Sequence, residues 1–359
     1  MKQIDAKRLG LSFAGCFLGA GYVSGQELWQ FFGSFGYKGI FGLAFALILI
    51  CLVGIMLLRL NEKTGIGEPD KLVVMWPSPV LRSAVTLLEL LFLFGVCTIM
   101  SAGVGALIEQ LFGIPAFVGS GAFAVLVAAA SLAGLSGMVK AFSATVPVLC
   151  GVTVVFGIMS LAGDNGTLKA IFTAGETGRA ANPLMGSWLI AALSFACYNI
   201  FGSIAMIAPL GSCLKRRSTA ISGIFAGGAV LLLIALGVLI SCCSAPEFTS
   251  AELPMLALAS SKGAAVGYLY GALLLIAMFG TSLSSMVGLM NMLTAKSEKV
   301  GAHRTGFTAA ISAAVFTGSL FGFGELIGVI YPMFGYCSSV FIVLMTIHFV
   351  KVKKNENKA

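Results

Sequence analysis

Charged side chains are scarce in this chain. Asp, Glu, Lys and Arg make up 10% of its 359 residues, whereas 58% are hydrophobic. A soluble domain carries about 25% charged residues, so the composition excludes one and indicates an integral membrane protein. Apolar runs recur along almost the whole length. We therefore expect a polytopic protein in a lipid bilayer, without a separate soluble domain.

Histidine is almost absent as well. The chain has only His303 and His348, and no nucleophile, metal-ligand or phosphate-loop motif accompanies them. The nine cysteines are scattered through apolar runs, with neither metal-ligand spacing nor a disulfide framework. We expect buried thiols that act as small hydrophobes. Nothing in the sequence favours an enzyme or a resident cofactor.

The apolar runs predict ten membrane-spanning helices, since one crossing needs about 20 apolar residues. The expected ranges are 9–34, 38–59, 82–112, 115–136, 139–162, 187–213, 217–243, 263–294, 303–322 and 325–349. The polar connection 244–262 carries two prolines and is expected to hold a short helix.

The distribution of basic residues gives this topology an orientation. With the N-terminus inside, eighteen of the 22 Lys and Arg residues fall on the cytoplasmic side, and only Lys38, Lys169, Arg179 and Lys262 fall outside. Cytoplasmic loops are enriched in Lys and Arg, so we expect a protein of the cell membrane with both termini in the cytoplasm. The same enrichment accounts for the net charge of +8 without nucleic acid as a partner.

Three pairs of segments recur at nearly one spacing. SFAGCFLGAG from Ser12 matches SFACYNIFGS from Ser194, an offset of 182. LFGVCTIMSAG from Leu93 matches MFGTSLSSMVG from Met278, and Pro147 matches Pro332, both at an offset of 185. Each partner lies five predicted spans further on, and an odd number of spans inverts the second copy. The sequence thus predicts a 5+5 inverted repeat.

This repeat divides the chain into four parts. They are a first five-helix unit (1–162), an extracytoplasmic loop (163–186), a second, inverted five-helix unit (187–350) and a cytoplasmic tail (351–359).

The stretch 11–36, which contains most of the first span, is built to lose its helical winding at mid-depth. Gly15, Gly19 and Gly21 surround its midpoint, and glycine costs about 1 kcal/mol relative to alanine in a helix interior. Polar residues follow the glycines at membrane depth: Ser24, Gln26 and Glu27. Unwound backbone is tolerated there only where it is buried in protein or lines a water-filled cavity. The alternative is a straight helix whose glycines allow close packing.

The sixth span has a comparable interruption. Its apolar middle contains Tyr198, Asn199, Gly202 and Ser203. As the repeat counterpart of the first span, it is predicted to be discontinuous too.

The run GAGYVSGQELWQFFGSFG, residues 19–36, resembles the signature of YkvI-type membrane proteins, permeases of the amino acid–polyamine–organocation superfamily. The resemblance implies a LeuT-type fold of two inverted five-helix repeats. Helices 1 and 6 would be unwound at a central solute site, and helices 3 and 8 would line it. A looser similarity to neurotransmitter:sodium symporters covers residues 14–21 and 194–203.

The resemblance also implies binding residues. The solute site would comprise Cys16, Phe17, Gly19, Ala20 and Gly21 of the first span with Phe195, Ala196, Tyr198 and Asn199 of the sixth. A sodium site would combine the carbonyls of Gly15 and Leu18 with hydroxyls of the eighth span, either Thr281 and Ser282 or Ser284 and Ser285. A second sodium site of those symporters needs Asn and Thr where this chain has Tyr22 and Ala196. The resemblance does not extend to that second site.

The proposed break has its own chemistry. A half-helix beginning near Gly21 would direct unpaired N–H groups at the cavity, which suits a carboxylate. Carbonyls freed before the break suit a cation or an ammonium group. A zwitterionic amino acid satisfies both, so it is the expected class of solute. Side-chain selectivity would fall to Cys97, Thr98, Ser101 and Phe201.

Two further groups are candidates for coupling. The hydroxyls at 281, 282, 284 and 285 suit Na⁺, although such hydroxyls also bond to their own helix and support packing. Glu27 has no Lys or Arg nearby in its span, and an unpaired intramembrane carboxylate marks a functional site. We interpret Glu27 as a group for proton coupling or gating; the alternative is a carboxylate that caps a backbone break.

The leading hypothesis is a secondary transporter of a small amino-acid-like solute, coupled to Na⁺ or H⁺. A membrane sensor that binds solute without moving it is the alternative. A channel would show a continuous polar stripe or charged rings, and the sequence shows interrupted helices instead.

Overall fold

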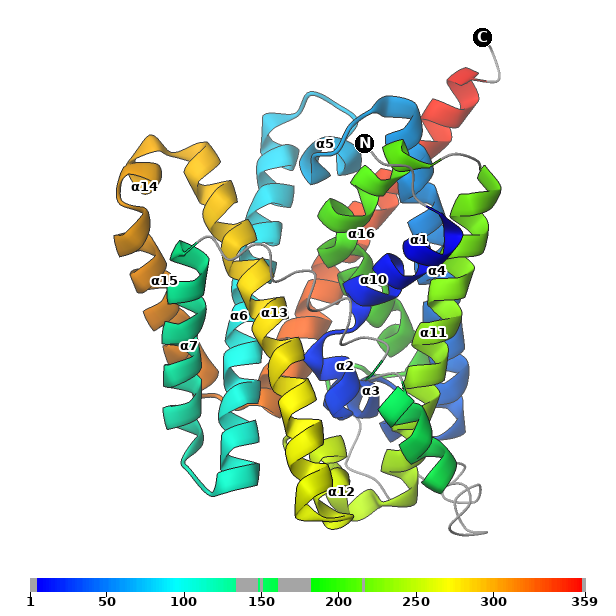
Figure 1. The fold of residues 1–359 in the computed structure, drawn as a ribbon. Coiled ribbons are helices and arrows are strands. Elements are labelled where there is room, and N and C mark those ends of the chain that lie inside the picture. Colours follow the sequence, from blue (N-terminus) through cyan, green and yellow to red (C-terminus); the bar gives the residue numbers. More distant parts are fainter. Residues whose placement is uncertain (1–4, 134–147, 149–150, 161–181, 215–216, 357–359) are drawn as a thin grey trace.

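The computed structural model describes residues 5–133, 148, 151–160, 182–214 and 217–356. The regular elements in these ranges are helices (Figure 1). In chain order they are α1 (Ala6–Phe17), α2 (Ala20–Ser24), α3 (Gln26–Phe31), the 3₁₀ helix η1 (Gly33–Phe35), α4 (Tyr37–Thr64), α5 (Pro69–Val73), α6 (Pro79–Phe112), α7 (Ala116–Leu132), α10 (Trp188–Ile207), η3 (Ala208–Cys213), α11 (Arg217–Ser244), η4 (Pro246–Ser250), α12 (Pro254–Ser261), α13 (Ala264–Lys296), α14 (Glu298–Ala302), α15 (Arg304–Ser319) and α16 (Phe323–Glu356).

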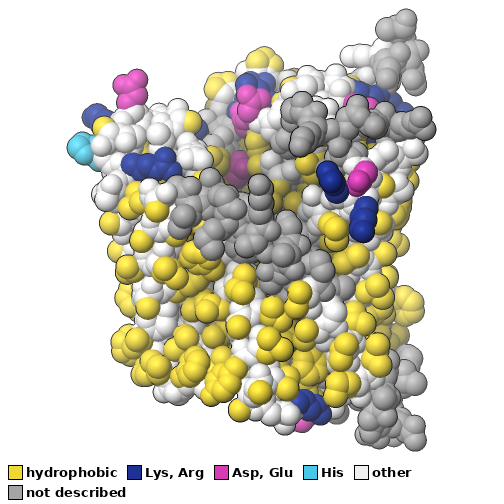
Figure 2. Space-filling model, viewed as in Figure 1, with side chains coloured by type: hydrophobic (Ala, Val, Ile, Leu, Met, Phe, Trp, Pro, Cys, Tyr) yellow, Lys and Arg dark blue, Asp and Glu magenta, His cyan; other side chains and the backbone are white. Residues whose placement is uncertain are grey.

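Among the described residues, six helices are long and apolar enough to cross a membrane: α4, α6, α10, α11, α13 and α16. Shorter apolar helices cover Ala116–Leu132 and Gly151–Ser160. In Figure 2, hydrophobic side chains cover the middle of the visible face and charged side chains gather toward its two ends. This is the surface of a membrane protein, whose apolar band faces lipid tails.

The longer described helices lie in or near the predicted ranges, although only six of them are long and apolar enough to count as spans. The first span, which was predicted to lose its helical winding, is divided among α1, α2, α3 and η1. The predicted fifth span (139–162) and the loop 163–186 lie mostly outside the described residues. The last helix, α16, continues through Glu356 into the segment predicted as the tail. The short helix predicted in the 244–262 connection is α12.

The long helices pack in pairs. Helix α6 lies along α13, α10 lies between α16 and α4, and α1 lies along α11. α7 and α15 sit together beside α6, at one edge of the bundle in Figure 1. The chain begins and ends at the same end of the bundle, where α5 and α14 also lie (Figure 1).

Glycines bring α1 and α11 into backbone contact. A methyl group at Gly227 of α11 would lie 2.6 Å from the carbonyl oxygen of Gly10, and one at Gly10 would lie 2.8 Å from that of Gly223. A membrane gives helices no hydrophobic force toward one another, so close packing between small residues holds such pairs together.

A Gly227→Leu substitution is therefore expected to separate α1 from α11 and destabilise the protein by roughly 1–3 kcal/mol, the usual cost of overpacking. Gly306→Leu on α15 is the control, because a Cβ there meets no atom within 4 Å. The midpoint of thermal unfolding in detergent should fall for the first variant and stay unchanged for the second. Equal midpoints would mean that the glycine contact carries no packing energy.

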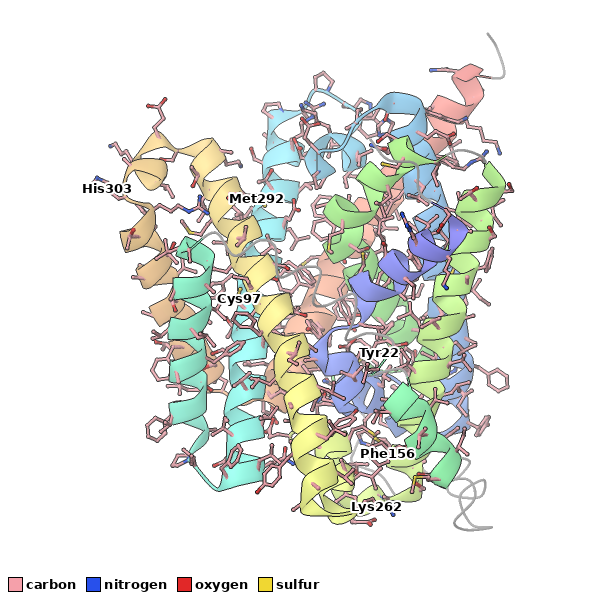
Figure 3. The ribbon with its side chains drawn as sticks, in the orientation of Figure 1. Tyr22, Cys97, Phe156, Lys262, Met292 and His303 are labelled. Carbon is pink, nitrogen blue, oxygen red and sulfur yellow. The ribbon has the colours of Figure 1, made fainter. Side chains whose placement is uncertain are left out.

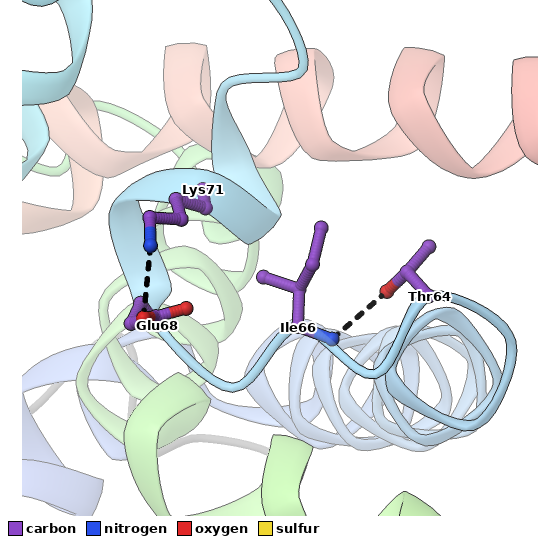
Figure 4. A network of polar contacts seen from close by, with 4 residues as sticks. All are labelled: Thr64, Ile66, Glu68 and Lys71. Atoms are coloured by element: carbon purple, nitrogen blue, oxygen red, sulfur yellow. Dashed lines mark hydrogen bonds and ion pairs between the residues drawn. The ribbon is translucent and has the colours of Figure 1, made fainter.

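The connection from α4 to α5 lies at the end of the bundle that holds both termini (Figure 1). Gly65 ends α4 in a left-handed conformation (φ 67°), and the hydroxyl of Thr64 accepts a hydrogen bond of 3.3 Å from the Ile66 N–H. Lys71 then pairs with Glu68 at 2.9 Å (Figure 4). Both side chains of that pair are exposed, so it contributes little to stability.

Candidate functional site

The first span is interrupted at Leu18 and Gly19. Helix α1 ends at Phe17 and α2 begins at Ala20. Gly19 is extended (φ −81°, ψ 169°), and its N–H bonds to the Phe17 carbonyl at 2.8 Å instead of continuing the helix. The last carbonyls of a helix have no partner within it, so the end of α1 presents acceptor oxygens here. Among the described residues, a Cβ at Gly19 would meet no atom within 4 Å, so this part of the chain leaves space beside the interruption.

The segment after the interruption is not one half-helix. Gly25 adopts a left-handed conformation (φ 89°) and divides α2 from α3. Glycine takes this conformation at little cost, and here a Cβ would also lie 3.1 Å from Met255 Cγ. Helix α2 has only five residues. The expected half-helix dipole directed at a carboxylate is therefore far weaker than the sequence predicted.

The predicted break in the sixth span is wrong. Helix α10 runs without interruption through Tyr198 and Gly202. The polar side chains there bond to their own helix: Asn199 Nδ2 donates to the Phe195 carbonyl at 3.0 Å, and Ser203 Oγ donates to the Ile200 carbonyl at 2.8 Å. Because local bonds satisfy these groups, they do not unwind the backbone. The helix tightens only at η3, where Pro209 has no N–H to continue it.

Glu27 is the centre of the candidate site. Its side chain is 4% exposed, and Oε1 accepts a hydrogen bond from the hydroxyl of Tyr198 on α10. A Cβ at Gly21 would lie 2.5 Å from Glu27 Oε2, so the carboxylate lies against the backbone just after the interruption. Within the described ranges, no Lys or Arg forms an ion pair with Glu27. In this part of the chain, the site therefore holds a buried carboxylate that is not paired with a Lys or Arg.

Aromatic rings surround this carboxylate. Tyr331 of α16 stacks on Tyr198, with ring centroids 4.6 Å apart and planes 12° apart. Phe195 and Phe31 contact Tyr198 from the other side, each with centroids 5.7 Å away. Tyr22, near the middle of the bundle in Figure 3, anchors α2 to α11 by donating to the Leu231 carbonyl at 2.8 Å. The rings fix the direction of the Tyr198 hydroxyl and exclude water.

A cavity of about 210 Å³ lies at the start of α16. This helix starts in the half of the bundle away from the two termini (Figure 1). Its lining residues are Trp29, Gln30, Ser34, Asn182, Pro183, Leu184, Gly324, Glu325, Gly328 and Val329. Gln30 Nε2 donates to the Gly324 carbonyl at 2.9 Å, and Asn182 Nδ2 donates to the Gly328 carbonyl at 2.7 Å. Glu252 accepts the Gly324 N–H at 2.5 Å and so caps α16 from a separate segment.

The cavity and Glu27 lie along one face of α16. Gly324, Gly328 and Tyr331 follow at a spacing of four and three residues, which places them in a row on that face. The first two line the cavity, and the third stacks on the partner of Glu27. At 1.5 Å per residue, Tyr331 lies roughly 5 Å from Gly328 along the helix axis, toward the C-terminal end of α16. Tyr331 stacks on Tyr198, which is the hydrogen-bond partner of Glu27. This places Glu27 about one helical turn from the residues that line the cavity.

Other predicted solute-site residues lie elsewhere. Ser101 donates to the Ser120 carbonyl of α7 at 3.0 Å, and Phe201 packs against Phe341 with centroids 6.0 Å apart. Thr98 bonds back to the Phe94 carbonyl at 2.9 Å. Cys97 Sγ contacts the Ser282 carbonyl of α13 at 3.4 Å (Figure 3). These contacts place the four selectivity candidates in helix packing, and none of them is with Glu27.

On the first span, the predicted residues Cys16 and Phe17 also have local partners. Cys16 Sγ donates to the Ser12 carbonyl at 3.1 Å, and Phe17 packs edge-on against Phe13 at 4.9 Å. Ala20 and Ala196 are fully buried. Of the predicted solute-site residues, the structure brings Gly21 and Tyr198 into direct contact with Glu27.

The hydroxyl cluster of α13 is divided between two faces. Ser282 and Ser285 are buried, whereas Ser284 is exposed. Thr281 bonds back to the Ala277 carbonyl at 3.0 Å. Helix α13 reaches the first span at α2, where the Tyr270 hydroxyl donates to the Val23 carbonyl at 2.6 Å. In the described part of the chain, no hydrogen bond joins these hydroxyls to Gly15 or Leu18.

Sequence reasoning missed Tyr331 and Gln30. Both were available as signals: Gln30 lies one turn after Glu27, and Tyr331 ends the row that begins with Gly324 and Gly328. The sequence pattern does not show that this row of α16 lies against α3. Gln30 and Gly324, which are hydrogen-bonded to each other, are 294 residues apart in the chain.

Comparison with solved structures gives the fold, which is of the LeuT type. The chain superimposes on the inward-facing conformation of Mhp1 with a TM-score of 0.67 and 15% identity, over 96% of this chain and 76% of that one. A Na⁺-coupled sialic acid symporter in its substrate-bound outward-open state gives a TM-score of 0.64 and 13% identity, over 96% and 79%.

Sequence comparison gives the relatives. No family model matches the chain. It is 25% identical to the membrane protein YkvI of Bacillus subtilis over 342 residues, 94% of each chain. It is 23% identical to the protein YyaD of the same organism over 352 residues, covering 94% of this chain and 95% of that one. The resemblance to YkvI-type membrane proteins seen in residues 19–36 is thus confirmed over nearly the full length.

Proposed function

We propose that the protein is a secondary active transporter, which moves a small amino-acid-like solute across the cell membrane by alternating access with Na⁺ or H⁺ as coupling ion. The observation that carries this proposal is the interruption at Leu18 and Gly19, beside the buried carboxylate of Glu27, in a fold shared with solved transporters. An interrupted span beside open space can bind a solute at mid-depth and release it to either side.

The packing supports ten crossings in two inverted halves. In the predicted repeat, the first span (α1) is the counterpart of the sixth (α10), and the second (α4) is the counterpart of the seventh (α11). The contact between α10 and α4 therefore corresponds to the contact between α1 and α11, and both are extensive. Cys97 and Ser282 differ by 185, the offset of the repeat, and they contact each other. A residue that touches its own counterpart lies at the symmetry axis between the halves. Termini at one end of the bundle (Figure 1) fit an even number of crossings, with both ends in the cytoplasm.

The solute would bind between the end of α1 and α10. The freed carbonyls of α1 and the Glu27 carboxylate suit its ammonium group. The chemistry is binding and release, so no resident cofactor is required, and the partners are the solute, the ion and the bilayer.

For Na⁺, the buried hydroxyls of Ser282 and Ser285 are the α13 candidates. Ser282→Ala and Ser285→Ala should each weaken Na⁺ stimulation of transport about tenfold, because losing one hydrogen-bonding or ligating group in the interior costs about 1–3 kcal/mol. Ser284→Ala is the matched control on the exposed face of the same helix. The Na⁺ concentration for half-maximal uptake measures the effect, and an unchanged value in both buried variants would exclude this site.

Counterflow in proteoliposomes tests the proposed function. Vesicles loaded with an unlabelled amino acid should take up the same labelled amino acid transiently above equilibrium, and Na⁺ and pH gradients applied separately should identify the coupling ion. Solute binding without counterflow would instead identify a membrane sensor.

A further inference from the structure

We propose that the Glu27 carboxylate binds either a proton or the ammonium group of the solute, one at a time, so that the protein exchanges an amine cation for a proton. This inference rests on the proposed function and adds to it the part of the solute that is recognised and the direction of coupling.

The charge balance of the site is the first argument. Glu27 is 4% exposed and has no Lys or Arg partner in the described chain. The titratable groups that face it are tyrosines: Tyr198 donates its hydroxyl to Oε1, Tyr331 stacks on Tyr198, and Tyr22 precedes it on α2. An isolated charge in a low-dielectric interior is costly, so the carboxylate needs one positive charge, and only one. A proton and an ammonium group are alternatives for that position.

The position of the Glu27 carboxylate beside Gly21 is the second argument. This is where the sequence predicted that backbone N–H groups would receive the carboxylate of a zwitterion. The structure places Glu27 Oε2 against Gly21 instead and reduces α2 to five residues. The solute therefore meets a carboxylate at this position.

The charge of the cavity at the start of α16 is the third argument. The cavity contains neutral amide and hydroxyl groups, from Gln30, Ser34 and Asn182, and the acidic residue Glu325, but no Lys or Arg among its described lining. The row formed by Gly324, Gly328 and Tyr331 separates the cavity from Tyr198, the partner of Glu27. A cation that enters this cavity meets no like charge among the described residues.

The exchange step is balanced. The protonated carboxyl of Glu27 releases H⁺ as the ammonium group of the amine binds the resulting carboxylate, so one proton leaves for each amine that arrives. No covalent bond is formed and no electron moves. Because the proton and the amine compete for one site, lowering the pH weakens amine binding. The apparent affinity for the amine should fall about tenfold for each unit by which the pH is lowered, over the range in which Glu27 carries a proton.

Binding to the purified full-length protein tests this proposal with matched four-carbon probes: n-butylamine, butyrate and the zwitterion 2-aminobutyrate. We expect n-butylamine to raise the thermal unfolding midpoint and butyrate to leave it unchanged. In weakly buffered solution, amine binding should release one proton per molecule bound. Stabilisation by butyrate, or by none of the straight-chain amines from methylamine to hexylamine, would overturn the proposal.

Glu27→Gln should lose both the stabilisation by amine and the proton release. Glu89→Gln, a carboxylate of α6 away from this site, should retain both. If Glu27→Gln does not fold, Glu27→Asp and the proton release of the wild-type protein decide the question: amine binding without release would contradict the exchange. Counterflow of 2-aminobutyrate that n-butylamine does not inhibit would leave the transporter proposal standing and refute this one alone.

Discussion

Replacing Glu27 with Gln is expected to abolish solute accumulation driven by a pH gradient. If one proton is exchanged per solute, a gradient of one pH unit, worth about 1.4 kcal/mol, supports up to a tenfold concentration ratio. In Glu27→Gln the ratio should not exceed one, because an amide cannot carry the proton. Glutamine has nearly the same shape and keeps an oxygen that can accept the Tyr198 hydroxyl, so the fold should be retained.

The measurement is the accumulation of a labelled solute, identified by counterflow, in proteoliposomes with the membrane potential clamped. Glu89→Gln is the control for loss of a carboxylate from a span, since Glu89 lies on α6, and it should retain the tenfold ratio. A tenfold ratio in Glu27→Gln would show that another group carries the proton.

The second large effect is expected at Gly21. Its Cβ in a Gly21→Ala variant would lie 2.5 Å from Glu27 Oε2 and 3.4 Å from Ile327 Cδ1. The methyl group must displace the carboxylate from its position, and a shift of about 1 Å at a binding group can cost a hundredfold in rate. We expect transport to fall by roughly that factor.

Gly306→Ala on α15 provides the control, since it lies outside the proposed site. A Cβ there meets no atom of the described residues within 4 Å, and Gly306 lies inside a helix, where alanine is well accommodated. The initial rate of counterflow, normalised to folded protein, should distinguish the two variants. Similar rates would mean that the carboxylate moves aside without consequence.

Much of the fold could be predicted because each membrane crossing needs about 20 consecutive apolar residues, which can be recognised in the sequence. Six of the expected spans are long apolar helices, and the glycines of the first span coincide with its interruption. The sixth span shows the limit of this reasoning. Its polar residues resemble a break in the sequence, but Asn199 and Ser203 bond to carbonyls of the same helix, a choice that residue type does not determine.

The site shows the same limit in three dimensions. Glu27 and Tyr198 were each identifiable, the first as a carboxylate at membrane depth and the second as a polar residue in an apolar span. Their hydrogen bond joins residues 171 positions apart, which only the packing of α3 against α10 reveals. The left-handed conformation of Gly25 was equally invisible, as was its place against Met255 and Cys242, whose side chains would lie 3.1 and 3.2 Å from a Cβ there.

The backbone contact between α1 and α11 has a consequence for how the molecule would move. The chain leaves the helical conformation at Leu18 and Gly19, whereas Gly10 and Gly227 touch so closely that sliding between them is blocked. A swing of α1 about this interruption would carry α11 with it. Spin labels at Leu11 and Phe225, both exposed, should then keep a constant separation while each moves relative to α10, and the moving unit would be two helices rather than one short helix.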